Sequence, residues 1–297
     1  MEITARECSR DWRIIFPKPA TGCCWLAMSE HQSPLSRART RLQAHFGQQT
    51  AHQRRPQAEP IAPDLWQWVC TKTPLLSNLS SAEQDKLAEY AAAFIAERPF
   101  YHAQQMELTD QRIVFIAALA CLPVLHLNLD WLAGIRSVVV YPDAFFGRQE
   151  YMDDAGIMHV LEDWRAGEAW ENGTLVLSWA DVIRADHPFG GQVIIHEIAH
   201  FIDGANGAEN GFPPLGAHID PRRWTTVFEQ AFARLNAEVN SQQPLLIDPY
   251  AATSPAEFFA VLSETFFTEP ERVVEFDREL FALLSAFYYP QQRAMHA

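Results

Sequence analysis

The stretch Val193-Ile-Ile-His-Glu-Ile-Ala-His-Phe-Ile-Asp203 decides the fold and much of the chemistry expected of this chain. It contains an H-E-x-x-H motif, which random placement of the chain's histidines and glutamates produces only about 0.03 times. In a helix, His196 and His200 lie one turn apart on the same face, so two imidazole nitrogens can bind one tetrahedral Zn²⁺ ion. Glu197 follows the first histidine and can act as general base toward a water at the metal.

The residues around the motif favour a buried helix, because most positions between 192 and 202 that are not part of the motif are apolar. The alternative is an ordinary core helix whose two histidines have structural partners. That alternative leaves the Glu197 carboxylate in an apolar stretch without a partner, which is costly. The sequence therefore predicts a zinc site on this helix.

Composition and charge limit the class of protein. The chain has 297 residues, of which 48% are hydrophobic and 20% charged, as in typical globular proteins. The net charge of −14 argues against direct nucleic-acid binding. Residues 1–64 carry a net charge of +3, and the remainder carries −17. We predict a weakly ordered extension over 1–64, with one helix at 34–46, and a folded domain over 65–297.

Cysteine usage and the N-terminal pattern bear on the compartment. The chain has an odd number of cysteines, and no two of them form a C-x-x-C pair, so a disulfide framework or a cysteine zinc site is not expected. The five cysteines are Cys8, Cys23, Cys24, Cys70 and Cys121. The sequence shows no signal-peptide pattern and no apolar stretch typical of a membrane span. We therefore expect a cytoplasmic protein without membrane contact.

Hydrophobic periodicity predicts a helix-dominated α+β fold with a small sheet beside the motif helix. Two β-branched or apolar runs predict strands at Ser137–Tyr141 and Gly173–Trp179. Besides the motif helix, the predicted helices are Ser80–Phe94 with Ser81 as N-cap, Thr109–Ala120, Trp224–Val239, Ser254–Thr268 and Pro270–Tyr289.

The third metal ligand is not adjacent to the motif. A catalytic zinc normally takes three protein ligands, but the position six residues after His200 is Asn206, which is a poor zinc ligand. Glu257 and Glu264 are seven residues apart and share one helix face, so either carboxylate is a candidate. Glu257 also completes a capping box that begins at Ser254, which would explain it without a metal. Glu264 is either a ligand or an acceptor for a ligand histidine.

Asp203 also has two interpretations. It lies near the end of the motif helix, where an acid opposes the helix dipole. It is either a solvated acid beside Gly204, an acceptor for a ligand histidine, or a contact that holds the motif helix.

Two segments together, His196–Asp203 and Tyr250–Pro270, resemble the Mlc titration factor A family of zinc peptidases. Shorter matches occur in the same order, at Leu122–Leu125, Trp131–Leu132, Val140–Pro142 and Leu177–Trp179. The resemblance covers roughly residues 70–290 and leaves 1–64 unmatched. It implies a zincin-like metallopeptidase domain with a site of the gluzincin type, similar to lethal-factor-type peptidases.

That resemblance assigns roles to particular residues. It implies that His196, His200 and Glu257 bind Zn²⁺, that Glu197 is the catalytic base, and that Tyr250 stabilises the oxyanion. The implied activity is hydrolysis of peptides, with aminopeptidase action on small substrates. The strand at Gly173–Trp179 could pair with an extended peptide substrate.

A second class of function follows from the same resemblance. The family is named for binding the glucose repressor Mlc, so this chain could be a regulatory binding protein that sequesters such a repressor, with little or no catalysis. The complete H-E-x-x-H motif favours retained catalysis, because a protein that only binds has no need of Glu197.

Overall fold

The computed structural model describes residues 58–103, 106–143, 145–152, 158–165, 167–170, 173–183, 191–241 and 244–290. Between 145 and 170 the description covers the backbone only. The predicted helix at 34–46 and most of the predicted extension lie outside these residues. Helix α2 begins at Pro63, just before the predicted domain boundary, and Ile61 already packs against the core.

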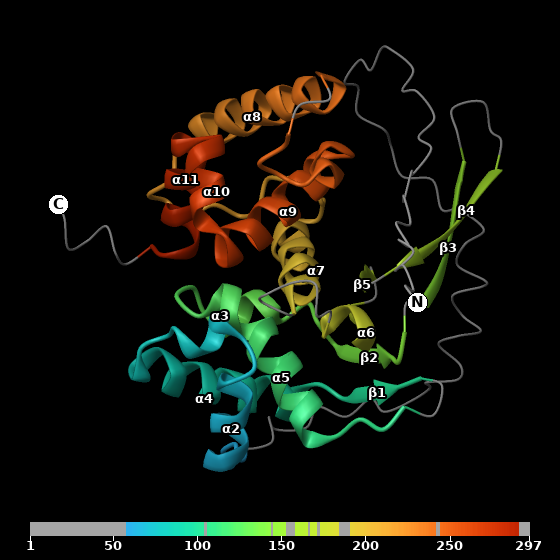
Figure 1. The fold of residues 1–297 in the computed structure, drawn as a ribbon, viewed down its shortest axis with the longest axis vertical. Helices are drawn as coiled ribbons and strands as arrows, with labels where there is room; N and C mark the ends of the chain where they lie inside the picture. The colour runs from blue at the N-terminus through green and yellow to red at the C-terminus, as the bar shows by residue number, and fades with distance from the viewer. Residues whose placement is uncertain are drawn as a thin grey trace, which may run out of the picture. The chain divides into compact units, whose positions relative to one another are not determined.

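The predicted α+β class with a helix-dominated domain is confirmed (Figure 1). The helices are α2 Pro63–Cys70, α3 Pro74–Ser77, α4 Ser81–Glu97, α5 Asp110–Cys121, α6 Trp179–Val182, α7 Gln192–Asp203, α8 Pro221–Ser241, α9 Pro255–Thr268, α10 Pro270–Phe276 and α11 Arg278–Tyr288. Short 3₁₀ turns are η1 Leu122–Val124, η2 Leu129–Leu132, η3 Gly204–Asn206 and η4 Pro249–Ala252. Among the described residues, no helix is both long enough and apolar enough to cross a membrane.

The strands are β1 Phe100–His102, β2 Ser137–Tyr141, β3 Phe145–Met152, β4 Met158–Arg165, β5 Gly167–Trp170 and β6 Thr174–Ser178. Four of them form one sheet in the order β1-β2-β6-β5. β1, β2 and β6 are parallel, and β5 runs antiparallel to β6. β3 and β4 pair as a separate antiparallel hairpin.

Strand β6 occupies an interior position in the sheet, because it pairs with β2 on one side and with β5 on the other. Its backbone groups are therefore already engaged on both edges. The prediction that the Gly173–Trp179 strand pairs with an extended substrate is wrong for this reason. Its side chains at Leu175 and Leu177 are fully buried instead.

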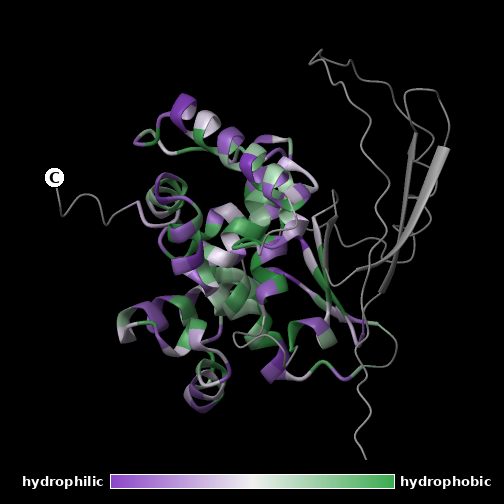
Figure 2. Ribbon diagram, turned by 45° about the horizontal axis from the view of Figure 1, so that its top comes forward, coloured by the Kyte–Doolittle hydropathy of each residue, from purple (hydrophilic) through white to green (hydrophobic). Residues whose placement is uncertain are grey.

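Helix α7, which carries the motif, packs against α5, α9 and strand β5 (Figure 1). Its apolar side consists of Ile194, Ile195, Ile198 and Ile202, and none of the four is exposed. Figure 2 shows hydrophobic segments gathered at the centre of the helical body and hydrophilic ones on the outer helices. Four fully buried isoleucines stabilise the placement of α7 by about 6–12 kcal/mol in gross transfer free energy.

The start of α7 depends on a glycine. Gly191 has φ +77° and precedes the first helical residue without a side-chain cap. A Cβ at this position would stand 2.1 Å from Leu119 Cδ1 of α5. A residue with a side chain would therefore be strained in its backbone, and the Leu119 side chain would have to move.

Two details of the predicted helices are wrong. The N-cap of α4 is Ser80 and not Ser81: its hydroxyl accepts from the Glu83 amide, and the Glu83 carboxylate accepts from the Ser80 amide. The predicted single helix Pro270–Tyr289 is two helices, because the Asp277 carboxylate accepts the amides of Glu279 and Leu280 and begins α11.

Candidate metal centre

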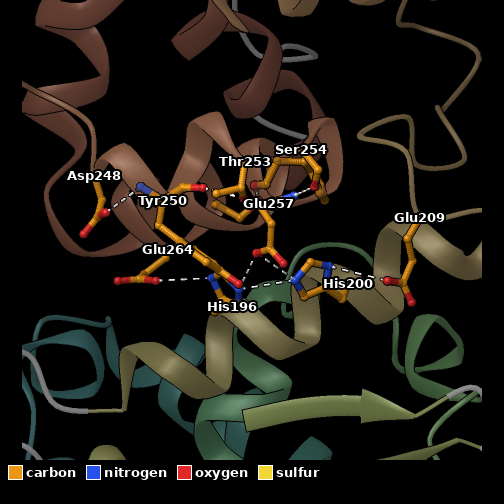
Figure 3. Close-up of polar contacts among 11 residues, drawn as sticks. His196, His200, Glu209, Asp248, Tyr250, Thr253, Ser254, Glu257 and Glu264 are labelled. Atoms are coloured by element: carbon orange, nitrogen blue, oxygen red, sulfur yellow. Dashed lines mark hydrogen bonds and ion pairs between the residues drawn. The ribbon is translucent and has the colours of Figure 1, made fainter. Parts of the chain in front are cut away.

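Helices α7 and α9 bring three side chains to one point (Figure 3). Glu257 Oε2 lies 3.1 Å from His196 Nε2 and 3.4 Å from His200 Nε2. The two Nε2 atoms are 3.2 Å apart. These three atoms form a nearly equilateral triangle, with one corner from α9 and two from successive turns of α7.

The triangle has the dimensions of three corners of a zinc tetrahedron. With metal–ligand bonds of about 2.0–2.1 Å, ligand atoms in a tetrahedral site stand about 3.3–3.4 Å apart. Among the described residues, no hydrogen bond of good geometry reaches the buried Glu257 Oε2, although both histidines are close. The three atoms therefore converge on a common point. Two imidazoles and one carboxylate form the His₂Glu set typical of catalytic zinc, so the residues fit this metal.

Local sequence explains how Glu257 reaches the histidines. Ser254 is the N-cap of α9, and its hydroxyl accepts the Glu257 amide at 3.1 Å. Pro255 occupies the first turn, where its missing amide costs nothing. The capping interaction therefore uses the backbone of Glu257 and leaves its carboxylate free to face α7. The Glu257 carboxylate does not accept the Ser254 amide, so the predicted capping box is incomplete and does not explain this side chain.

Glu264 occupies a different place, on the far side of the His196 ring. Its Oε2 lies 3.5 Å from Nδ1 of His196, whereas Glu257 faces Nε2 of the same ring. A carboxylate at Nδ1 accepts the ring proton and orients the imidazole. Of the two candidate ligands, the geometry thus favours Glu257 as the one facing the candidate metal position.

The electrostatics of the cluster follow from burial and close opposite charges. Burial lowers the pKa of His196, but the carboxylates of Glu257 and Glu264 outweigh it and raise this pKa to about 10. The pKa of His200 is also raised, because Glu257 outweighs the effect of burial. Burial raises the pKa of Glu257, but the two histidines hold it well below its usual range. A metal that binds here must displace protons from the imidazoles.

The structure also brings Glu197 and Tyr250 to the cluster. Glu197 is buried, and its charge contributes to the raised pKa of both histidines. Tyr250 lies on η4 and is half-exposed, with its ring centroid 6.1 Å from that of His196 (Figure 3). Asp248 accepts the Tyr250 amide at 2.8 Å and fixes the turn that carries this tyrosine.

Asp203 is fully buried, so its interpretation as a solvated acid is wrong. Its Oδ2 accepts the Gly211 amide at 2.7 Å. Burial raises the pKa of Asp203 to about 6, against the opposing effect of hydrogen bonds from the backbone of residues 210–212. This carboxylate ties the end of α7 to the loop that follows η3.

Sequence reasoning missed one acidic residue beside the cluster. Glu209 Oε2 lies 3.7 Å from His200 Nδ1, on the side of this ring away from Glu257 (Figure 3). Glu209 belongs to a Gly/Asn-rich loop without periodicity, so no local pattern places its side chain. The one available signal was a carboxylate in the loop directly after the motif helix.

Comparison with known proteins agrees with the metal-binding chemistry of this site. The model of the family described as glucose-regulated metallo-peptidase M90 matches residues 48–289, and so extends into the predicted N-terminal extension. A protein named Mlc titration factor A from Klebsiella pneumoniae subsp. pneumoniae is 38% identical over 200 residues, which is 67% of this chain and 76% of the relative. The protein of the same name from Cronobacter sakazakii is 37% identical over 71% of this chain and 80% of its own length. The one from Escherichia coli (strain 55989 / EAEC) is 36% identical over 75% of this chain and 86% of its own length. The chain therefore belongs to the glucose-regulated metallo-peptidase M90 family, together with proteins named Mlc titration factor A.

Proposed function

We propose that this protein is a zinc-dependent peptidase that acts as an aminopeptidase on small peptides. The observation that carries the proposal is the triangle of His196 Nε2, His200 Nε2 and Glu257 Oε2, with sides of 3.1–3.4 Å. Its dimensions and its donor set suit catalytic zinc. Membership of a metallopeptidase family supports the same reaction class.

Zinc, when bound, polarises a substrate carbonyl and lowers the pKa of a coordinated water. Glu197 is the proposed general base: it takes the proton from the attacking water and delivers it to the leaving amine. Its position next to His196 on α7 and its burial support this role. A buried carboxylate in an apolar helix keeps its charge close to the reacting groups and little screened by solvent.

Tyr250 is the proposed oxyanion donor. The half-exposed side chain extends from η4 toward His196 (Figure 3), so a substrate at the metal position would come within its reach. A phenol hydroxyl that donates to the developing negative charge stabilises the transition state more than the substrate. Glu264 is the proposed acceptor for the Nδ1 proton of His196, which keeps Nε2 available for the metal.

One experiment tests this function directly. Bound zinc is quantified in the purified full chain, and hydrolysis of chromogenic aminoacyl substrates is followed with and without a chelator. We expect one zinc per chain, turnover that the chelator abolishes, and recovery when zinc is restored. Stoichiometric zinc without turnover on any aminoacyl or peptide substrate would contradict the peptidase proposal while leaving the metal site intact.

The names of the relatives favour a second function. Proteins that share 36–38% identity with this chain are named Mlc titration factor A. We propose that this chain also binds a repressor of the Mlc type, a role that is compatible with peptidase activity. Binding of such a repressor to immobilised Glu197→Gln protein tests it, because this variant removes the base and preserves the surface. No binding at micromolar concentration would contradict the proposal.

The compartment and the domain boundary are also proposals. Cys70 and Cys121 are both free and buried, which supports a reducing, cytoplasmic location. We retain the proposed boundary near residue 64, with residues 1–64 as an extension that neither binds zinc nor contributes to hydrolysis. The opposite sign of its net charge supports this separation.

A further inference from the structure

His196 and His200 differ in the partner of their second ring nitrogen, Nδ1. A neutral imidazole that binds a metal through Nε2 must carry its proton on Nδ1, and that proton needs an acceptor. His196 has Glu264 at 3.5 Å for this purpose. His200 Nδ1 is buried, and none of the described residues makes a hydrogen bond to it. A buried N–H without an acceptor is destabilising.

The Glu209 carboxylate is placed to accept the Nδ1 proton of His200. Its Oε2 lies 3.7 Å from His200 Nδ1, which is less than 1 Å beyond ordinary hydrogen-bond distance. The Glu209 side chain is 48% exposed, and a small rotation of this side chain would close the gap. Metal binding at Nε2 would place the proton on Nδ1 and so supply the donor for this contact.

The loop that carries Glu209 is held in place by several hydrogen bonds. Asp203 accepts the Gly211 amide at 2.7 Å, and the Trp224 indole donates to the Gly211 carbonyl at 3.1 Å. Within the loop, the Asn206 amide donates to the Phe212 carbonyl at 2.6 Å. Gly211 thus ties the loop to α7 and α8, and the Asn206–Phe212 bond joins the segments before and after Glu209. The carboxylate thus stands on an ordered segment.

Close approach of Glu209 to the helix end also depends on Gly204. A Cβ at Gly204 would lie 3.3 Å from Glu209 Cγ and 3.6 Å from its Oε1. The absence of a side chain at this position lets the glutamate stem pass over the last turn of α7 toward His200. Gly204 therefore allows the Glu209 side chain to lie against the end of α7.

We propose that Glu209 is the positioning residue for His200. Its carboxylate accepts the Nδ1–H of His200, fixes the tautomer with Nε2 toward the metal, and so matches the role of Glu264 at His196. The inference rests on the proposed zinc site and adds to it a residue from the loop between α7 and α8. Through this contact the conformation of the loop influences metal affinity.

The test compares zinc affinity in four full-length proteins by competition with a chromophoric chelator. The expected loss in Glu209→Ala is about 10–100-fold, as is typical when an acceptor behind a ligand histidine is removed. Glu209→Gln should recover most of this loss, because its amide oxygen can still accept the Nδ1 proton. Glu229→Ala removes an equally negative, exposed side chain on α8 and should leave affinity unchanged.

Imidazole ¹⁵N–¹H spectra of the zinc-loaded proteins provide a second readout. The wild-type protein should show two Nδ1–H signals protected from exchange. Glu264→Ala should lose one, and Glu209→Ala should lose the other. Unchanged zinc affinity in Glu209→Ala would overturn the assignment, and so would reduced affinity with both signals retained. A wild-type protein that binds no zinc would overturn this inference together with the proposed function, so the two failures are distinguishable.

Discussion

Asp203 offers the sharpest test of how burial controls charge near the metal centre. The carboxylate is fully buried at the end of α7, and burial raises its pKa from 3.8 to about 6. A carboxyl whose pKa is higher in the folded than in the unfolded protein binds protons more strongly when folded. Its contribution to stability is fully present below the unfolded pKa and is lost as pH rises through the folded pKa.

The size of this effect follows from the shift. Each pKa unit corresponds to about 1.4 kcal/mol, so the whole shift costs the folded protein about 3 kcal/mol once Asp203 is ionised. Roughly 2 kcal/mol of this loss in folding free energy occurs between about pH 4.5 and pH 7.5. An asparagine at this position has no charge to bury, and its side-chain oxygen can still accept the Gly211 amide.

We therefore expect Asp203→Asn to gain stability relative to wild type as pH rises through this window. Urea unfolding at several pH values measures the difference, with a chelator present so that metal binding does not contribute. The raised pKa of His196 affects the wild type and the variant alike, because both proteins keep this histidine; its contribution to stability is lost as pH rises from 6.5 toward about 10.

Asp85→Asn is the matched control, since this aspartate is exposed on α4. This substitution removes an exposed charge and should not reproduce the pH-dependent gain expected of Asp203→Asn. A difference between Asp203→Asn and wild type that is independent of pH would refute the reasoning. Equally, a variant that is less stable than wild type throughout the window would show that the charged carboxylate stabilises the loop more than burial penalises it.

Further predictions concern the cluster and the extension. Glu257→Ala should weaken zinc binding by about 100-fold or more, because each ligand contributes roughly 3 kcal/mol of a typical zinc-binding free energy. Glu264→Ala should weaken zinc binding by only about 10–100-fold. The reverse order of the two variants in a chelator competition would make Glu264 the ligand. Glu197→Gln should keep its zinc and lose about 10²–10⁴-fold in kcat, so near-native turnover would exclude it as the base. Tyr250→Phe should keep zinc and fold while kcat falls by about 10²–10³-fold; an unchanged kcat would assign this tyrosine to packing. A chain shortened to 58–297 should retain zinc and thermal stability, because Ile61 is the first of the described residues whose side chain packs on the core; loss of either would move the boundary toward the N-terminus.

The motif helix could be predicted from sequence because its evidence is local. Apolar periodicity, paired histidines and Gly204 after the last turn all lie within a few residues, and α7 forms over the expected range. Strand β2 was predictable for the same reason, since three consecutive valines favour a buried strand. The choice between Glu257 and Glu264 was not local. Both share one helix face, and only the packing of α9 on α7 shows which ring nitrogen each carboxylate meets.

Other features escaped prediction because they depend on distant partners. The break at Asp277 was hidden by continuous apolar periodicity, although Asp277 satisfies the first amides of α11. The interior position of β6 follows from β5, a short edge strand that the sequence pattern did not reveal. Glu209 meets His200 only because the loop doubles back across Gly204. Each case requires knowledge of what packs against a residue, which the local pattern does not contain.

Binding of one zinc ion by His196, His200 and Glu257, between α7 and α9, can be observed directly. The most direct measurement is an anomalous difference map at the zinc absorption edge from crystals of the zinc-loaded protein. We expect one strong peak per chain, about 2.0–2.2 Å from the two Nε2 atoms and a Glu257 oxygen. A peak bound by Glu264 in place of Glu257, or no peak between these helices in protein that contains stoichiometric zinc, would contradict it.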